Sequence, residues 1–141
     1  MQEALQEENV ISKITEKGYE PYIYVFGMME ASVSKIAGAL FGAFAGNQPK
    51  PFILNFSDKG IAFLELNSTC SKYTDLHNFF AADQIEEVTF KKGMIVNELT
   101  ILTKAGDKQK IKIASITAGA KWQKGNVGRL VEFISSYKKT N

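Results

Sequence analysis

The chain has 141 residues, of which 45% are hydrophobic and 23% are charged, a composition that suits one globular domain and excludes wholesale disorder. Its net charge is only +2, but residues 1–90 carry 6 Lys and 12 Asp or Glu, whereas residues 91–141 carry 11 Lys or Arg and 3 Asp or Glu. The basic half favours nucleic acid, anionic lipid or an acidic partner, although lysines also suit the solvent-facing positions of strands. Because Cys70 is the single cysteine, an intramolecular disulfide and a disulfide-stapled secreted scaffold are excluded.

The first segment is acidic, with three glutamates among its first eight residues. It lacks the basic start and apolar run of a secretory signal, so we expect a cytoplasmic location. Residues 2–17 then predict an amphipathic helix that ends at Gly18 and packs on the domain. Its apolar stripe consists of Ala4, Leu5, Val10, Ile11 and Ile14. Residues 22–29 (YIYVFGMM) are rich in aromatic and β-branched types and predict a buried strand after Pro21.

A glycine-rich segment at residues 31–48 follows this strand. Its small residues recur every four positions, which places them on one helix face: Ser34, Gly38, Gly42 and Gly46. The uninterrupted apolar run, residues 36–46, is far shorter than the roughly 20 residues that a membrane-spanning helix needs, so no span is expected. Three alternatives remain: packing within the domain as a helix or mobile loop, self-association or partner binding, and shallow insertion of Leu40, Phe41 and Phe44 into a membrane surface.

From Pro51 onward, short apolar runs alternate with turns. The runs predict six further strands, at residues 52–56, 61–66, 76–81, 85–90, 94–104 and 108–116. Glycine-containing turns separate several of them, at residues 57–60, 91–93 and 105–107. In the last strand Ile111 and Ile113 alternate with lysines, so one face belongs to the core and the other faces solvent. Successive strands with short connections favour an antiparallel sheet.

A C-terminal helix closes the chain at residues 126–139. Asn126 can cap its start, and Lys138 and Lys139 suit the negative end of the helix dipole. Apolar residues fall at helical spacing, at Val127, Leu130, Val131, Ile134 and Tyr137. The sequence therefore predicts a mainly β protein with a helix at each end.

This order of elements resembles the pleckstrin-homology-like (PH-like) barrel, in particular its bacterial members. The resemblance is carried by FILNFSDKGIAFLEL, DQIEEVTFKKG and NELTILTKAGDKQKIKI; it covers residues 50–138 and, more loosely, 22–29. It implies that residues 1–141 form one domain, a seven-stranded antiparallel barrel with a capping C-terminal helix, and a binding scaffold rather than an enzyme. Family members that bind phosphoinositides use basic residues between the first two strands. Here that place holds the glycine-rich segment, with only Lys35 and Lys50 at its ends, so no ligand residue is carried over.

Two further candidate interaction sites lie in the basic half. Lys108, Lys110 and Lys112 share one strand face and can bind phosphates, but the strand has no aromatic residue for base stacking, so no nucleic-acid partner is expected. Trp122, which lies in a lysine-rich loop, suits either a hydrophobic plug or an interface anchor. The candidate interaction residues are Gly38, Leu40, Phe41, Gly42, Phe44, Gly46, Trp122, Lys108, Lys110 and Lys112.

The sequence predicts no catalytic residue, no metal and no cofactor. Asp75 can orient the imidazole of His77, but a metal site needs three or four ligands, and no second histidine stands at ligand spacing. Cys70 lies seven residues from His77, and nothing in the sequence brings a base to its thiol. Glu86 and Glu87 point to opposite faces of a strand and cannot act as a pair.

We therefore expect a non-enzymatic intracellular binding or assembly module whose partner is a protein or a second copy of the chain. The alternative is a peripheral membrane module. In that alternative Leu40, Phe41 and Phe44 insert, while the lysines of the basic half attract anionic lipid.

Overall fold

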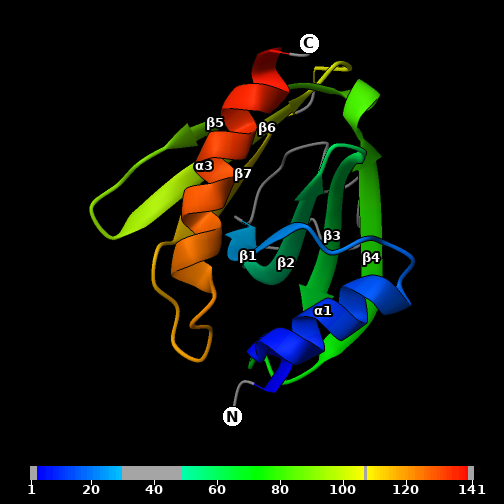
Figure 1. Cartoon of the computed structure of the whole chain (residues 1–141), viewed down its shortest axis with the longest axis vertical. Coiled ribbons are helices and arrows are strands. Elements are labelled where there is room, and N and C mark those ends of the chain that lie inside the picture. Colours follow the sequence, from blue (N-terminus) through cyan, green and yellow to red (C-terminus); the bar gives the residue numbers. More distant parts are fainter. Residues whose placement is uncertain (1–2, 30–48, 107, 140–141) are drawn as a thin grey trace.

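The computed structural model describes residues 3–29, 49–106 and 108–139. A short 3-10 helix and an α-helix open the chain, strands follow, and a long helix ends the described part (Figure 1). The elements are η1 (Glu3–Leu5), α1 (Glu7–Glu16), β1 (Ile23–Met29), β2 (Lys50–Ser57), β3 (Gly60–Leu66), β4 (Tyr73–Ala81), η3 (Ala82–Gln84), β5 (Ile85–Lys91), β6 (Val96–Thr103), β7 (Lys108–Ala114) and α3 (Gln123–Lys139).

Seven antiparallel strands form one sheet in the order β4-β3-β2-β1-β7-β6-β5. This confirms the predicted mainly β fold with an N-terminal and a C-terminal helix. The predicted closed barrel is corrected to an open sheet, because the order is linear and no pairing joins β4 to β5 within the described residues. These two strands are consecutive in the chain, but η3 separates them. The N–H of Ala82 donates to the carbonyl of Lys59 at 2.9 Å, which ties η3 to the β2–β3 turn.

The main core lies on one face of the sheet and is covered by α3, which packs against β1 and β5. Ile111 and Ile113 of β7 are buried there and alternate with exposed lysines, as predicted. Gly27 of β1 also faces this core: a Cβ added at Gly27 would lie 2.7 Å from Cγ2 of Ile111. The absence of a side chain at Gly27 therefore lets β7 pack closely on β1.

A second apolar cluster lies on the opposite face, where η1 and α1 cover strands β1 to β4. The predicted packing of the N-terminal helix is confirmed for four residues of its stripe: Ala4, Leu5, Val10 and Ile14 are buried. The fifth residue, Ile11, is 39% exposed, so the prediction is wrong for it. The hydroxyl of Tyr73 donates to the carbonyl of Ala4 at 3.0 Å and the hydroxyl of Tyr24 donates to Glu7, so two strands anchor this helical segment.

Several boundaries differ from the predicted ones. The helix α3 begins at Gln123, three residues before the predicted start, and the proposed cap Asn126 lies inside it. Asn126 is buried and donates from Nδ2 to the carbonyl of Tyr24 at 2.9 Å, so it joins α3 to β1 rather than capping a helix end. The strand β6 begins at Val96 rather than at Met94, and β4 begins at Tyr73, earlier than predicted.

Candidate interaction surface

Six of the ten predicted interaction residues belong to the glycine-rich segment and lie outside the described residues. They are Gly38, Leu40, Phe41, Gly42, Phe44 and Gly46. Whether the segment packs, self-associates or touches a membrane therefore stays a prediction.

Trp122 is partly buried and packs against the second apolar cluster. Its indole Nε1 donates to the carbonyl of Leu5 at 2.8 Å, and its ring meets the ring of Tyr24 edge-on with centroids 5.5 Å apart. These contacts join the loop before α3 to η1 and β1. They are the contacts expected of a hydrophobic plug.

Lys108, Lys110 and Lys112 are exposed on the same face of β7. The register of the sheet places Lys112 beside Glu98 of β6, and Glu98 beside Lys91 of β5. Opposite charges on neighbouring strands are favourable, by roughly 0.2–1 kcal/mol for each pair. The three lysines of β7 thus belong to a surface that carries charges of both signs.

Among the described residues, the three most exposed large apolar side chains lie just before β6 or just after β7, and the sequence reasoning missed them. Met94 and Ile95, in the β5–β6 turn, are 103% and 80% exposed. Val96 starts β6 and is 43% exposed, and Ile116, beyond β7, is 76% exposed. Val96 pairs with Ala114, the last residue of β7, and Ile116 follows two residues later. We call Met94, Ile95, Val96 and Ile116 the tip surface.

A buried asparagine braces the base of this turn. Asn97 is 2% exposed and accepts a hydrogen bond from the N–H of Gly93 at 3.2 Å. Its Nδ2 donates to the carbonyl of Ile113 and to Oγ of Ser115, both at 2.9 Å. A Cβ at Gly93 would lie 2.0 Å from the carbonyl oxygen of Val96, so only glycine fits. The turn is therefore fixed to β6 and β7, and its apolar side chains point into solvent.

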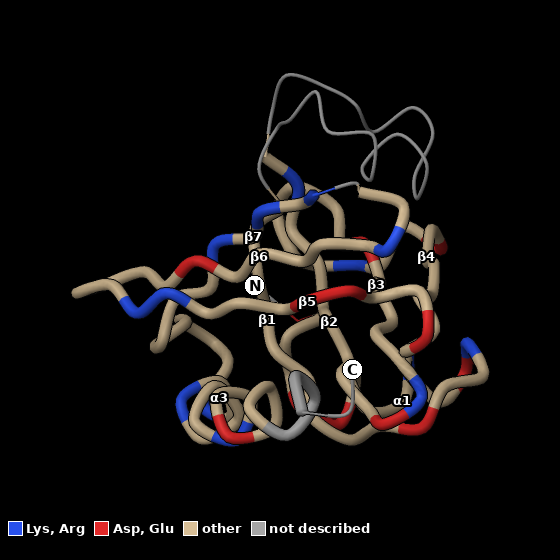
Figure 2. Tube along the Cα trace, turned by 90° about the horizontal axis from the view of Figure 1, so that it is seen from above, with Lys and Arg blue, Asp and Glu red and all other residues tan. Residues whose placement is uncertain are grey.

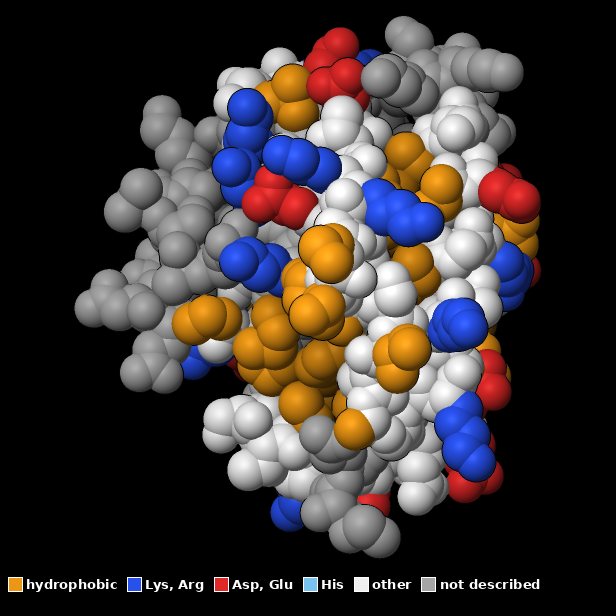
Figure 3. Space-filling model, turned by 90° about the vertical axis from the view of Figure 1, so that its left-hand side faces the viewer, with side chains coloured by type: hydrophobic (Ala, Val, Ile, Leu, Met, Phe, Trp, Pro, Cys, Tyr) orange, Lys and Arg blue, Asp and Glu red, His pale blue; other side chains and the backbone are white. Residues whose placement is uncertain are grey.

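The hairpin that carries the tip surface extends away from the body of the molecule, on the left of Figure 1 and Figure 2. Lys91 and Lys92 immediately precede the turn and are exposed. Figure 3 looks onto this side of the molecule and shows hydrophobic side chains gathered near its middle, with Lys and Arg side chains around them. Exposed apolar groups gathered in one place are typical of an interaction site.

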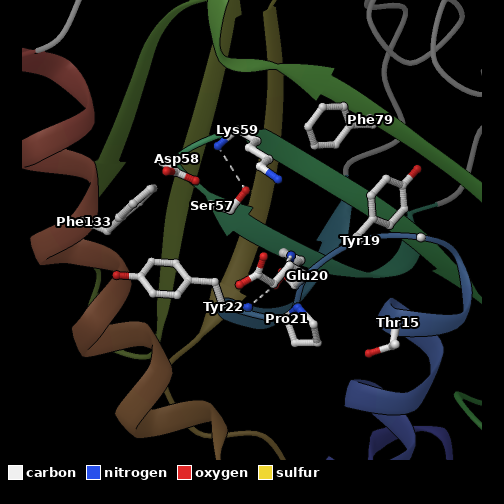
Figure 4. A pocket seen from close by; sticks show the side chains of 12 residues that line it. Thr15, Tyr19, Glu20, Pro21, Tyr22, Ser57, Asp58, Lys59, Phe79 and Phe133 are labelled. Atoms are coloured by element: carbon white, nitrogen blue, oxygen red, sulfur yellow. Dashed lines mark hydrogen bonds between the residues drawn. The ribbon is translucent and has the colours of Figure 1, made fainter.

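A separate hollow of about 990 Å³ lies between α1, the β2–β3 turn and α3, a volume within the range of small-molecule sites. In Figure 4, Tyr19 and Phe79 lie on one side of it and Tyr22 and Phe133 on the other. At its wall Asn55 is satisfied, since it accepts from the N–H of Tyr22 at 3.0 Å and donates to the carbonyl of residue 20 at 2.9 Å. The charged groups at the rim have both signs: Glu20, Asp58 and Lys59. This mixture does not specify one ligand class.

The titratable side chains around His77 pair differently from the sequence prediction. The hydroxyl of Tyr19 lies 2.9 Å from Nδ1 of His77, and Asp75 pairs with Lys17 at 3.2 Å rather than orienting the imidazole. Burial raises the pKa of the Tyr19 hydroxyl and of the Cys70 thiol. Neither group is thereby suited to proton transfer near pH 7.

No cluster of three or more His, Cys, Asp or Glu side chains within the described residues is placed to hold a metal ion. In residues 3–29, 49–106 and 108–139, no helix is both long enough and apolar enough to cross a membrane.

Comparisons with known proteins give little further information. No protein-family model and no curated protein sequence matches the chain. Among solved structures, the chain is similar to the hSac2 domain from human phosphoinositide phosphatase Sac2, with a TM-score of 0.45 and 13% sequence identity over 96% of this chain and 85% of that chain. At this low similarity the match carries no argument about the function of the chain.

Proposed function

We propose that the chain is a non-enzymatic binding module whose binding surface is the tip surface. The observation that carries the proposal is the almost complete exposure of Met94 and Ile95 on a turn that Asn97 holds in place. A flexible loop can fold its apolar side chains back onto the protein, but a braced turn keeps them in water. Covering them with a partner then releases the free energy of apolar burial.

The size of this gain is compatible with reversible binding. Full burial of one large aliphatic side chain contributes about 1.5–3 kcal/mol. Three such residues, Met94, Ile95 and Ile116, would together contribute roughly 5–9 kcal/mol on that scale. Association itself costs about 4–15 kcal/mol in lost translational and rotational freedom. The tip surface alone therefore supports weak binding, and tighter binding needs further contacts, for example with neighbouring charged residues.

The chemistry of the polar groups supports a binding role rather than catalysis. An enzyme of the nucleophilic type needs a nucleophile, a base within hydrogen-bond reach and a group that orients the base. Cys70 is buried and its pKa is raised, and Asp75, the expected partner of His77, pairs with Lys17. A reduced, buried lone cysteine also supports the intracellular location that we propose.

Membership of the PH-like superfamily is part of the proposal. Its support is the succession of seven antiparallel strands that is followed by a helix packed on β1 and β5. Such domains are binding scaffolds, in line with the role that we propose for the tip surface.

The test compares the intact chain with the double variant Met94→Ser/Ile95→Ser in two measurements. Sedimentation velocity measures association with a second copy, and flotation with anionic vesicles measures association with lipid. We expect the intact chain to show at least one association, and the double variant to lose it. If the double variant behaves as the intact chain in both measurements, the tip surface is not the binding surface and the proposal is wrong.

A further inference from the structure

We propose that the partner of the tip surface is an anionic lipid bilayer, into which Met94 and Ile95 insert while neighbouring lysines contact the headgroups. This inference rests on the proposed function, because it names the partner of the same surface. It is distinct from membrane contact through residues 36–46, since every residue that it uses lies in the described part of the chain.

The shape of the tip favours a lipid partner. The β5–β6 turn projects outward (Figures 1 and 2), and none of its residues lines the hollow shown in Figure 4. A projecting apolar group fits a protein partner only if that partner has a socket of matching shape. The boundary between headgroups and acyl chains accepts such a group without a preformed socket, to a depth of about 5–10 Å.

The residue types of the tip favour the same partner. Its four members are Met, Ile, Val and Ile, all aliphatic. Protein–protein hot spots are enriched in Trp, Tyr and Arg, which combine large contact area with directed hydrogen bonds, and the tip surface has none of these. Aliphatic side chains gain free energy on entering hydrocarbon in any orientation. The composition therefore favours a non-directional partner.

The charges beside the tip suit an anionic surface. The exposed Lys91 and Lys92 directly precede the apolar turn. Of the three acidic residues of this hairpin, Glu86 and Glu87 lie near the start of β5, away from the turn, and Glu98 has Lys112 and Lys91 as its neighbours across the sheet. The negative charge closest to the turn is therefore offset locally. The apolar tip thus has two exposed basic residues beside it in the chain. Anionic headgroups attract such lysines when they lie within about 10 Å of the surface, the screening length at 0.1 M salt.

The hydrogen bonds of Asn97 make the turn rigid before it binds. Asn97 ties Gly93 to the ends of β6 and β7, so the turn does not have to be ordered when it binds. A preorganised surface loses less conformational entropy on association. The brace also keeps the lysines and the apolar residues in one arrangement, with the apolar residues foremost.

Co-sedimentation of the full chain with vesicles tests this inference. We expect binding to vesicles that contain phosphatidylserine in phosphatidylcholine, little binding to phosphatidylcholine alone, and a decrease as salt is raised. The variant Met94→Ser/Ile95→Ser should lower the partition coefficient at least about tenfold, because two apolar side chains are lost. The variant Lys92→Gln should lower it about fivefold, the contribution of one lysine near an anionic surface.

Two matched substitutions serve as controls. Ile11→Ser removes a side chain that is 39% exposed on α1, and Lys72→Gln removes an exposed charge between β3 and β4. Neither residue belongs to the hairpin, so both variants should bind vesicles as the intact chain does. Far-UV circular dichroism of each variant checks that the fold is retained.

The inference is overturned if the intact chain does not bind the anionic vesicles, or if the double variant binds them as tightly as the intact chain. Without vesicle binding, self-association that is lost in the double variant would still support the proposed function. The lipid inference and the proposed function can therefore fail separately.

Discussion

Asn97 is the residue on which the geometry of the tip surface depends, and its replacement by alanine should destabilise the protein measurably. The side chain is 2% exposed and takes part in three hydrogen bonds, with Gly93, Ile113 and Ser115. A net contribution of about 1 kcal/mol for each bond gives a loss of about 3 kcal/mol in the free energy of unfolding. For a chain of this size such a loss lowers Tm by roughly 6–12 °C.

Urea denaturation followed by circular dichroism measures this loss. Hydrogen exchange at the Gly93 amide, which loses its acceptor, reports whether the turn has opened. The variant Ser115→Ala removes only one of the three bonds and should lose about 1 kcal/mol, which provides a graded comparison. In Asn97→Ala, vesicle binding should also weaken although every apolar side chain of the tip is still present, because the turn is no longer preorganised.

Two results together would refute the role of Asn97. In the first, the free energy of unfolding of Asn97→Ala lies within about 0.5 kcal/mol of that of the intact chain, as for an ordinary surface substitution. In the second, hydrogen exchange at the Gly93 amide is unchanged. In that case the three hydrogen bonds would not hold the turn. The exposure of Met94 and Ile95 would then have another cause than the brace.

Three further predictions concern packing and pH. Gly27→Ala should lower the free energy of unfolding by about 1–3 kcal/mol, because the new Cβ would meet Cγ2 of Ile111 at 2.7 Å. Gly128→Ala, in α3, places its new Cβ where nothing lies within 4 Å, so it should raise the free energy of unfolding by up to about 1 kcal/mol; urea denaturation measures both. Burial, with a smaller contribution from the hydrogen bond to Glu7, raises the pKa of Tyr24 from 10.0 to about 12. Because the folded state then holds the proton more tightly than the unfolded state, this contribution to stability is complete below pH 10 and is lost as the pH rises to about 12. Urea titrations across this range should show a smaller decrease for Tyr24→Phe than for the intact chain, and an equal decrease would contradict the assignment.

Local patterns were sufficient to predict most of the elements. The alternation of Ile111 and Ile113 with lysines indicates a strand with one buried face, and the structure confirms it. The turn at residues 57–60 separates β2 from β3, with Gly60 at a φ of +149° that only glycine adopts readily. These features depend on neighbours within a few residues, so the sequence pattern contains them.

Contacts between distant segments were not predictable in the same way. Gln123 donates to the carbonyls of Phe26 and Ala114 at 2.9 Å and accepts from the N–H of Phe26, and these bonds hold the start of α3 on the sheet. No local signal marks a glutamine for this role. For the same reason, the sequence did not show that Asn126 joins α3 to β1 instead of capping the helix.

The exposure of the tip surface is a consequence of tertiary structure. In the sequence, Met94 and Ile95 continue an apolar run that predicts a strand. The turn predicted at residues 91–93 extends in the structure as far as Ile95, and no local pattern marked this extension. Burial depends on whether another element packs over a side chain. The alternating pattern of a strand does not show whether its apolar face is covered.

The sequence by itself determined the kind of protein: one mainly β chain with seven strands, glycine turns and an amphipathic helix at each end. The spacing of apolar residues and the residue types that favour turns depend on neighbours within a few positions, so they can be recognised in the sequence. The tertiary structure alone decided that the sheet stays open, that α1 covers the face opposite α3, and that none of the described elements covers the side chains of Met94 and Ile95. These outcomes depend on which distant surfaces meet, and that is a property of the folded chain rather than of any segment within it.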